Sequence, residues 1–208
     1  MANELYPIFL KVHQFDMLIV GGGEVGFEKL TFLLRSSPNA RVTLIGKEIK
    51  DEIKSLAKDY NYVSLFERAF FNEDLTGMQM VILATEDHET NLEIRNEAKA
   101  RDILVNVADT PALCDFYLGS IVTKGDLKIA ISTNGKSPTI AKRLKETLSD
   151  VLPNEIDSLL QNMKDIRDRL KGNFGFKVKK LNHITQSLVS QRQNDNPCPE
   201  GCPLAQKD

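Results

Sequence analysis

The pattern Gly21-x-Gly23-x-x-Gly26 is the first feature of this sequence that can do chemistry. It follows an apolar run, residues 17–20, and opens a helix-like segment, residues 24–36, as the dinucleotide-binding fingerprint does. There the first glycine permits a tight turn, the second lets a pyrophosphate approach, and the third lets helix and strand pack closely. Free N–H groups at the helix N-terminus attract the anion. The alternative is a tight turn that binds nothing. The candidate cofactor-binding residues here are Gly21, Gly22, Gly23, Glu24, Val25 and Gly26.

Three more residues are candidates for contact with the nucleotide. An acidic residue about 20 positions beyond the glycines is expected to bind the ribose hydroxyls. The sequence there is IGKEI, which puts Glu48 slightly late, with Lys47 beside it. Glu48 favours NAD, whereas Lys47 could bind the 2′-phosphate of NADP. We therefore prefer NAD as the cofactor, and these two residues leave NADP open. Thr85 ends a fourth apolar run, where ligands bind in parallel sheets, and a simple strand-end cap is the alternative.

The elements that must position these residues alternate along the first half of the chain. Apolar runs without polar alternation, separated by helix-like segments, predict a parallel sheet covered on both faces, which is a doubly wound α/β fold. The predicted strands are 17–20, 41–45, 62–66, 78–85 and 102–108, and the predicted helices are 24–36, 48–59 and 88–101.

The pattern changes after this domain. Two β-like runs separated by KGD predict a hairpin over 116–133. A helix follows, with Ser137 as N-cap and Pro138 at its first position. Two more amphipathic helices are predicted in 154–192, broken near KGNFG, before a polar, proline-rich tail. We expect a Rossmann domain (1–113), a dimerisation segment (114–150), a helical substrate-binding region (151–192) and a mobile tail (193–208).

Charge is divided unevenly along the 208 residues, whose formal net charge is −2. Residues 1–135 hold 14 basic and 20 acidic residues, whereas residues 136–192 hold 12 basic and 6 acidic ones. The basic third indicates an anionic partner, such as a nucleic acid, a phosphate or a polycarboxylate, and a solvated helical face is the alternative. The sequence shows neither a signal peptide nor a membrane-spanning run, and its three cysteines do not form a secreted disulfide framework. We expect a cytoplasmic protein with no membrane partner.

The stretch VNVADTPALCDFYLGSIVTKGDLKIAISTNGKSPTIAKRLKETL, residues 105–148, resembles the siroheme-synthase family of precorrin-2 dehydrogenases and sirohydrochlorin ferrochelatases. YPIFLKV and VGGGEVGFEKL extend the resemblance from residue 6 to about 150, and ADTPALCDFYLGS is similar to the fungal bifunctional enzyme. The resemblance implies oxidation of precorrin-2 to sirohydrochlorin with NAD, Fe²⁺ insertion in many members, and a homodimer with tetrapyrrole clefts between domains. The methyltransferase domain of fused members is absent, so we do not expect the chain to make precorrin-2.

The resemblance also assigns residues. The family's essential aspartate matches Asp109, which follows the fifth strand at the same sheet edge as the glycines. A carboxylate there is suited to accepting a proton, and a turn cap is its alternative role. Thr133 stands where bacterial fusion members have serine, and many members have Ala at position 26. The eight carboxylates of precorrin-2 suit the basic third, where Lys142 and Arg143, with Lys145, are candidate substrate contacts.

Other residues and functions are weaker candidates. His13 is an alternative acid or base, Cys114 reads as a packed small hydrophobe, and Cys198 and Cys202 form C-x3-C without partner ligands, so no metal site is assigned. A Rossmann module that senses NAD and regulates a partner would explain the glycines but not the ADTP and ISTNGKSP motifs. A nucleic-acid binder is disfavoured, because the body is acidic and no nucleic-acid motif is present.

Overall fold

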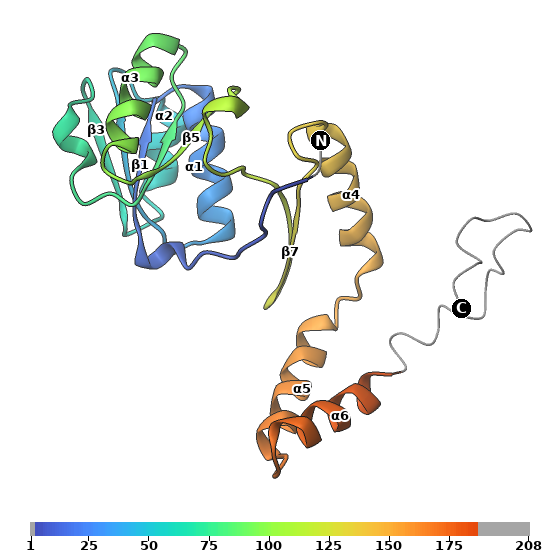
Figure 1. The fold of residues 1–208 in the computed structure, drawn as a ribbon. Helices are drawn as coiled ribbons and strands as arrows, with labels where there is room; N and C mark the ends of the chain where they lie inside the picture. The colour runs from blue at the N-terminus through green and yellow to red at the C-terminus, as the bar shows by residue number, and fades with distance from the viewer. Residues whose placement is uncertain (1–2, 187–208) are drawn as a thin grey trace, which may run out of the picture. The chain divides into compact units, whose positions relative to one another are not determined.

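Five parallel strands form the sheet that the alternating pattern predicts (Figure 1). The computed structural model describes residues 3–186. The strand order is β3-β2-β1-β4-β5, and every neighbouring pair is parallel. The strands are β1 (Asp16–Val20), β2 (Arg41–Gly46), β3 (Val63–Glu67), β4 (Met80–Leu83) and β5 (Leu104–Val107). The chain first builds the β2–β3 side and then crosses to β4 and β5, so the order switches beside β1. Ligands bind at the carboxyl ends of the strands at such a switch point.

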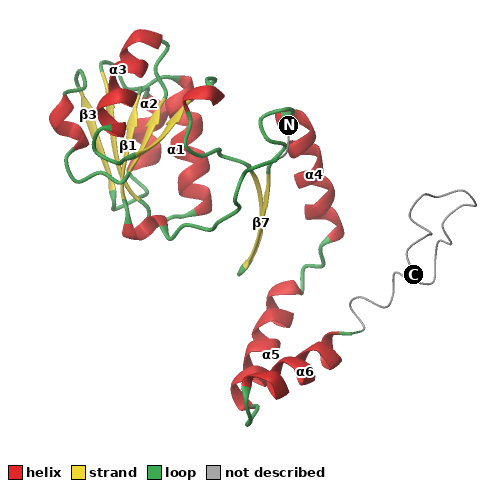
Figure 2. Ribbon diagram, in the orientation of Figure 1, coloured by secondary structure: helices red, strands yellow, loops and turns green. Residues whose placement is uncertain are grey.

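Helices cover both faces of this sheet (Figure 2). They are α1 (Glu24–Ser36), α2 (Asp51–Ala57) and α3 (His88–Lys99). Alternate residues of β1 enter different cores: Ile19 packs with α1 and α2 on one face, and Leu18 packs with α3 on the other. Both side chains are fully buried. The doubly wound α/β fold is therefore confirmed, and its strands read as unalternated apolar runs because both faces are covered.

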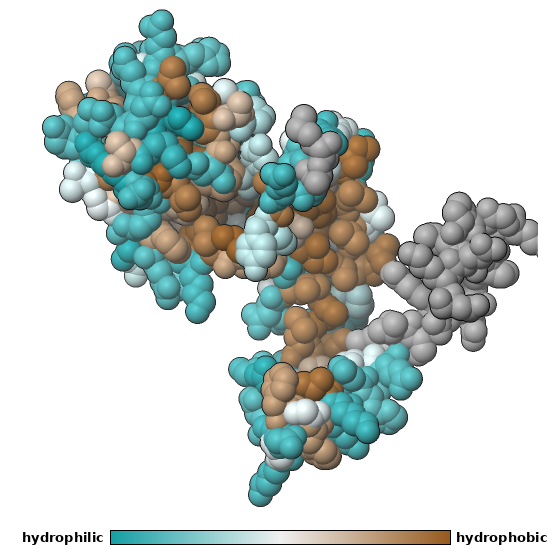
Figure 3. All heavy atoms as spheres, in the orientation of Figure 1, coloured by the Kyte–Doolittle hydropathy of each residue, from teal (hydrophilic) through white to brown (hydrophobic). Residues whose placement is uncertain are grey.

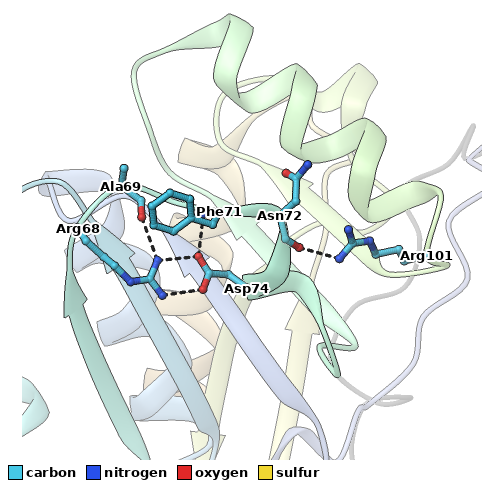
Figure 4. A network of polar contacts seen from close by, with 6 residues as sticks. All are labelled: Arg68, Ala69, Phe71, Asn72, Asp74 and Arg101. Carbon is cyan, nitrogen blue, oxygen red and sulfur yellow. Dashed lines mark hydrogen bonds and ion pairs between the residues drawn. The ribbon is translucent and has the colours of Figure 1, made fainter.

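The connection between β3 and β4 is fixed by an ion pair (Figure 4). Arg68 donates two hydrogen bonds to the Asp74 carboxylate, at 2.8 and 2.6 Å, and the same carboxylate accepts the Phe71 N–H at 2.8 Å. The Arg68 guanidinium also lies 5.4 Å from the ring centres of Phe66 and Phe71. Arg101, just after α3, donates to the Asn72 carbonyl at 2.7 Å. This network holds the short helix η2 (Asn72–Leu75) beside the sheet.

The segment after the sheet is a hairpin followed by a helix. The hairpin strands are β6 (Ser120–Lys124) and β7 (Leu127–Ile131), and Gly125 begins their two-residue turn with a φ of 53°. A positive φ at this position is what tight hairpin turns require. Helix α4 runs over Pro138–Val151, and Ser137 Oγ accepts the Ile140 N–H at 3.2 Å, so the predicted cap is confirmed.

The chain divides into two compact units, Met1–Thr123 with Lys128–Val151, and Lys124–Leu127 with the chain from Leu152 onward. The second unit contains α5 (Ile156–Arg169) and α6 (Phe174–Thr185). The break between them falls at residues 170–173, near KGNFG as expected. Within this unit, Asp157 accepts the Asp126 N–H of the hairpin turn at 2.8 Å. The four domain ranges expected from the sequence stay a prediction, and the tail they include lies outside the described residues.

Exposed apolar side chains follow one stripe of α4 (Figure 3). Ile140, Leu144 and Val151 are 54%, 45% and 64% exposed. Their spacing puts them on one face of the helix.

None of the helices within residues 3–186 has the length and apolar character that crossing a membrane requires.

Candidate cofactor and catalytic site

The glycine loop joins β1 to α1 at the carboxyl edge of the sheet. A Cβ on Gly21, whose φ is 124°, would lie 2.3 Å from the Ala84 carbonyl oxygen, and a Cβ on Gly26 would lie 2.0 Å from the Gly21 carbonyl oxygen. Packing therefore requires these two glycines, which agrees with the turn and helix-packing roles expected of them. A Cβ on Gly23 would meet no atom of residues 3–186 within 4 Å. Gly23 thus leaves an open approach at the N-terminus of α1, where an anion is favoured.

The loop after β2 closes one side of the glycine loop. The Gly21 N–H donates to the Ile45 carbonyl at 2.8 Å, and the Lys50 N–H donates to the Gly22 carbonyl at 3.0 Å. A Cβ on Gly22 would lie 2.1 Å from the Glu48 carbonyl oxygen. The side chains of Lys47 and Glu48 are exposed beside this contact. The structure therefore brings both ribose candidates next to the glycines.

Glu67, at the end of β3, is a second carboxylate near this loop. It accepts the Ile49 N–H and a Lys54 hydrogen bond, both at 2.9 Å, and these bonds, the Ile49 bond foremost, lower the pKa of Glu67. Because these bonds engage Glu67, Glu48 is the carboxylate better placed for the ribose hydroxyls.

An ion pair joins the residue before α2 to the first residue of α1. Lys50 contacts the carboxylate of Glu24, the first residue of α1, and this hydrogen bond raises the pKa of Lys50. The Glu24 side chain is 76% exposed. If a pyrophosphate binds at the N-terminus of α1, as the sequence predicts, the charge of Lys50 offsets the like charge of Glu24.

Thr85 follows β4 and is held by a buried side chain that sequence reasoning missed. The Thr85 hydroxyl donates to Asn91 Oδ1 at 2.7 Å, and Asn91 Nδ2 donates to the Thr85 carbonyl at 3.0 Å. Asn91 is only 2% exposed. A polar residue on the apolar face of a helix was the available signal, because a buried amide must find partners. Thr85 is a well-ordered strand end beside Gly21, which suits either of its two predicted roles.

Asp87 caps the N-terminus of α3 next to Thr85. Its carboxylate accepts the Thr90 hydroxyl at 2.7 Å and the N–H groups of Glu89 and Thr90. These bonds, with the Thr90 hydroxyl foremost, hold the pKa of Asp87 below its usual value, and the charge of Lys47 contributes. The cap fixes the N-terminus of α3 at the carboxyl edge of the sheet. The effect of Lys47 on Asp87 shows that the Lys47 charge acts at this edge too.

Asp109 follows β5, the strand beside β4, at the same carboxyl edge as the glycine loop. It is exposed, and its φ of 57° lies in the left-handed region that few non-glycine residues adopt. Within residues 3–186 its carboxylate has no hydrogen-bond or ion-pair partner. A capping role would give the carboxylate a backbone partner, so the geometry favours an exposed acceptor over a turn cap.

The other predicted residues lie in different surroundings. Thr133 is bonded to the backbone of Ser137, which it clamps with two 3.1 Å hydrogen bonds. Lys142 is exposed on α4, and Arg143 pairs with Glu146 at 2.8 Å. Lys145 lines a cavity of about 670 Å³ together with Glu24, Val25 and other α1 residues.

His13 lies in the short helix η1 (Val12–Gln14), immediately before β1. It is therefore at the amino edge of the sheet, opposite the edge that carries Asp109. Cys198 and Cys202 lie outside the described residues. Residues 3–186 hold no cluster of three or more histidine, cysteine or carboxylate side chains that could hold a metal.

Comparison with known proteins gives matches along nearly the whole chain. Residues 8–120 match a family model described as putative NAD(P)-binding, and residues 124–150 match one described as sirohaem biosynthesis protein, central. A siroheme synthase of Pseudoalteromonas atlantica is 35% identical over 177 residues, which are 85% of this chain and 38% of that protein. One of Methylococcus capsulatus is 36% identical over 79% of this chain and 34% of its own length. The chain thus spans little more than a third of these relatives.

A solved structure resembles the chain over most of its length. The structure titled SirC, precorrin-2 dehydrogenase, has a TM-score of 0.67 and 26% sequence identity. The match covers 90% of this chain and 96% of that one.

Proposed function

Because this chain belongs to the putative NAD(P)-binding family and is homologous to the siroheme synthases, we propose that it oxidises precorrin-2 to sirohydrochlorin with NAD. The observation that carries the proposal is the Asp109 carboxylate, which has no partner within residues 3–186 and is exposed at the same sheet edge as the open Gly23 backbone. The match to a precorrin-2 dehydrogenase over nearly its whole length supports the substrate. It also supports an enzyme over a module that only senses NAD.

The residues of the glycine loop fit the cofactor. The N–H groups of Gly22, Gly23 and Glu24 would hold the pyrophosphate at the positive end of α1, where no side chain blocks Gly23. Glu48 would bind the ribose hydroxyls, and Thr85 would line the strand-end side. When bound, NAD⁺ supplies a hydride acceptor.

Asp109 would supply the proton acceptor. Removal of a hydride from precorrin-2 leaves protons to be released from the macrocycle, and a free carboxylate oxygen of Asp109 is available to take one. The exposed side chain can pass that proton on to water. No step requires His13, which lies at the opposite edge.

Substrate contact is proposed for the basic helix after the hairpin. Lys142 and Arg143 on α4 would pair with carboxylates of the tetrapyrrole, and Thr133 would order the loop before the helix, as its two bonds to Ser137 suggest. The helical region 151–192 stays a predicted substrate-binding region. Cytoplasmic location stays a prediction from the sequence.

Two further parts of the proposal concern the metal and the assembly. Insertion of Fe²⁺ into sirohydrochlorin, with Fe²⁺ as substrate, is supported by the homology to siroheme synthases and by the free carboxylate of Asp109, a hard oxygen ligand. A homodimer is supported by the exposed apolar stripe of α4, since an apolar face of this kind is normally covered.

The test is anaerobic. Precorrin-2 and NAD⁺ are supplied to the full chain, and formation of NADH is followed together with the sirohydrochlorin spectrum. We expect NADH and sirohydrochlorin to form together in equal amounts. NAD binding without turnover would contradict the proposal and favour the sensing module. Fe²⁺ with sirohydrochlorin, in the absence of NAD, tests metal insertion separately.

A further inference from the structure

Side chains, and not another strand, close the free edge of β5. β5 is the last strand of the sheet, so its outer backbone groups have no strand partner. After Asp109 the chain turns back along this edge. Three side chains on β5 and on the returning segment, Asn106, Cys114 and Asp115, make the contacts, and we call them the β5 clamp.

Asp115 forms the first part of the clamp. Its carboxylate accepts the Val105 N–H at 2.9 Å, and its own N–H donates to the Val105 carbonyl at 2.8 Å. Lys99 pairs with the same carboxylate at 2.9 Å. Burial alone would raise the pKa of Asp115, but the bonds from Lys99 and Val105 outweigh it and lower that pKa. An ionised carboxylate therefore replaces a strand at this point.

Cys114 forms the second part and joins the two ends of the loop. Its sulfur accepts the Val107 N–H at 3.2 Å. The same sulfur lies 3.2 Å from the Val107 carbonyl oxygen and 3.4 Å from that of Thr110, and its S–H donates to one of them. Burial is the main cause that raises the pKa of the thiol, which keeps this proton in place. The thiol thus acts as donor and acceptor at once.

Asn106 completes the clamp from β5 itself. It is 7% exposed, and its amide donates to the Phe116 carbonyl at 2.8 Å and lies 3.5 Å from the Cys114 sulfur. A buried amide with these partners fixes where the returning segment lies.

Only residues 108–113 separate Val107 from Cys114, and Asp109 lies in this loop with its left-handed φ of 57°. Because the Asp109 carboxylate has no partner within the described residues, its position depends on the backbone that the clamp holds. We propose that Cys114 is a positioning residue for Asp109, since its thiol ties the strand before Asp109 to the segment after it. This inference rests on the proposed function, in which Asp109 accepts the proton.

Replacement of the thiol tests this inference. Cys114→Ala should lower the turnover of precorrin-2 by about 10- to 100-fold, the loss expected when a reacting group moves by about 1 Å. The Kd for NAD should not change, because the glycine loop is untouched. Cys114→Ser keeps a donor and an acceptor with a shorter reach, and should recover part of the rate. Ile94→Val, which removes a methylene from the same core but no hydrogen bond, is the control for lost stability and should keep the rate.

A double variant separates positioning from a general structural role. If Cys114 acts through Asp109, Cys114→Ala should cause no further loss in an Asp109→Ala background. Wild-type turnover in Cys114→Ala, or an equal loss in both backgrounds, would overturn the inference. The Asp109→Ala single variant shows whether a negative result concerns the proposed role of Asp109 or that of Cys114. If it keeps the wild-type rate, the proposed role of Asp109 is wrong, whereas an inactive Asp109→Ala beside an active Cys114→Ala contradicts only the role of Cys114.

Discussion

At the scale of single residues, the glycine loop divides into positions that protein packing needs and one that it does not. Gly21, Gly22 and Gly26 would each place a Cβ within 2.5 Å of a backbone oxygen, whereas a Cβ on Gly23 would meet nothing within 4 Å in the part of the chain that the structure describes. Because packing does not require glycine at position 23, we infer that the missing side chain makes room for a ligand. Gly23 is therefore the position at which cofactor binding and folding can be separated by substitution.

Gly23→Asp should raise the Kd for NAD by at least about tenfold, because the carboxylate blocks the pyrophosphate and repels it. The fold should be preserved, because Gly23 is the N-cap of α1 and aspartate is a preferred N-cap residue. Calorimetric titration with NAD and a thermal melt measure the two effects. Gly22→Ala is the matched control and should lower the melting temperature, since its Cβ would meet the Glu48 carbonyl oxygen at 2.1 Å. Unchanged NAD affinity in Gly23→Asp would contradict the assigned site.

The ion pair between Lys50 and Glu24 gives a second prediction. Lys50→Met leaves the Glu24 carboxylate uncompensated at the N-terminus of α1, where the pyrophosphate is expected, and should raise the Kd for NAD by about two- to fivefold. The same substitution in a Glu24→Gln background should have little effect, because no charge is then left to offset. Both Kd values can be measured by titration at low salt. An equal loss in the two backgrounds would mean that Lys50 contacts the cofactor or supports the loop independently of Glu24.

At the scale of elements, local signals predicted α1 over its full range, 24–36, because its composition and spacing are helical and the glycines precede it. The fourth strand was predicted over 78–85 but covers only Met80–Leu83. The Ala84 N–H still donates to the Val20 carbonyl at 2.7 Å, and Thr85 then turns to Asn91. The helix predicted from residue 48 begins at Asp51, because residues 48–50 pack against Gly22. These differences arise from contacts between segments far apart in the sequence, which periodicity does not contain.

Much of the candidate site could also be predicted, for the same physical reason. A strand–glycine–helix pattern is local, so the cofactor loop is readable from sequence, and parallel topology then brings Asp109 to the same edge. The partners that hold the site were not predictable. Asn91 contacts Thr85, and Cys114 contacts Val107, only after the chain has folded back. Neither residue type predicts that role from sequence alone.

The connection between β3 and β4 gives a prediction about stability. Asp74→Asn removes an acceptor of two Arg68 bonds, and at neutral pH it should lower the free energy of unfolding by about 1 kcal/mol. Arg68 is the main cause that lowers the pKa of Asp74, so this stabilisation is present above the unfolded pKa of about 3.9 and is lost as pH falls below it. Urea unfolding from pH 7 to pH 3 should therefore show the two proteins converging below about pH 4. A difference that stays constant with pH would contradict the assignment.

At the scale of the whole molecule, the exposed face of α4 bears on assembly. Ile140 and Leu144 lie one turn apart on α4, and each side chain is about half exposed. If a second copy covers this stripe, Ile140→Glu with Leu144→Glu should shift the protein from dimer to monomer in analytical ultracentrifugation. Lys142→Glu, on the same helix outside the stripe, is the control and should leave the mass unchanged. A wild-type protein that sediments as a monomer at micromolar concentration would contradict the dimer.

We propose that one fold joins a dinucleotide loop to a proton-accepting carboxylate at a single sheet edge, and Asp109→Asn is the variant that examines this arrangement. The amide keeps the size of the side chain but cannot take a proton from the macrocycle. The decisive measurement is the single-turnover rate of precorrin-2 oxidation, taken beside the Kd for NAD. We predict an unchanged Kd and a rate lower by at least about 100-fold, the loss typical of a missing general base. A variant that binds NAD and oxidises precorrin-2 at the wild-type rate would contradict the account.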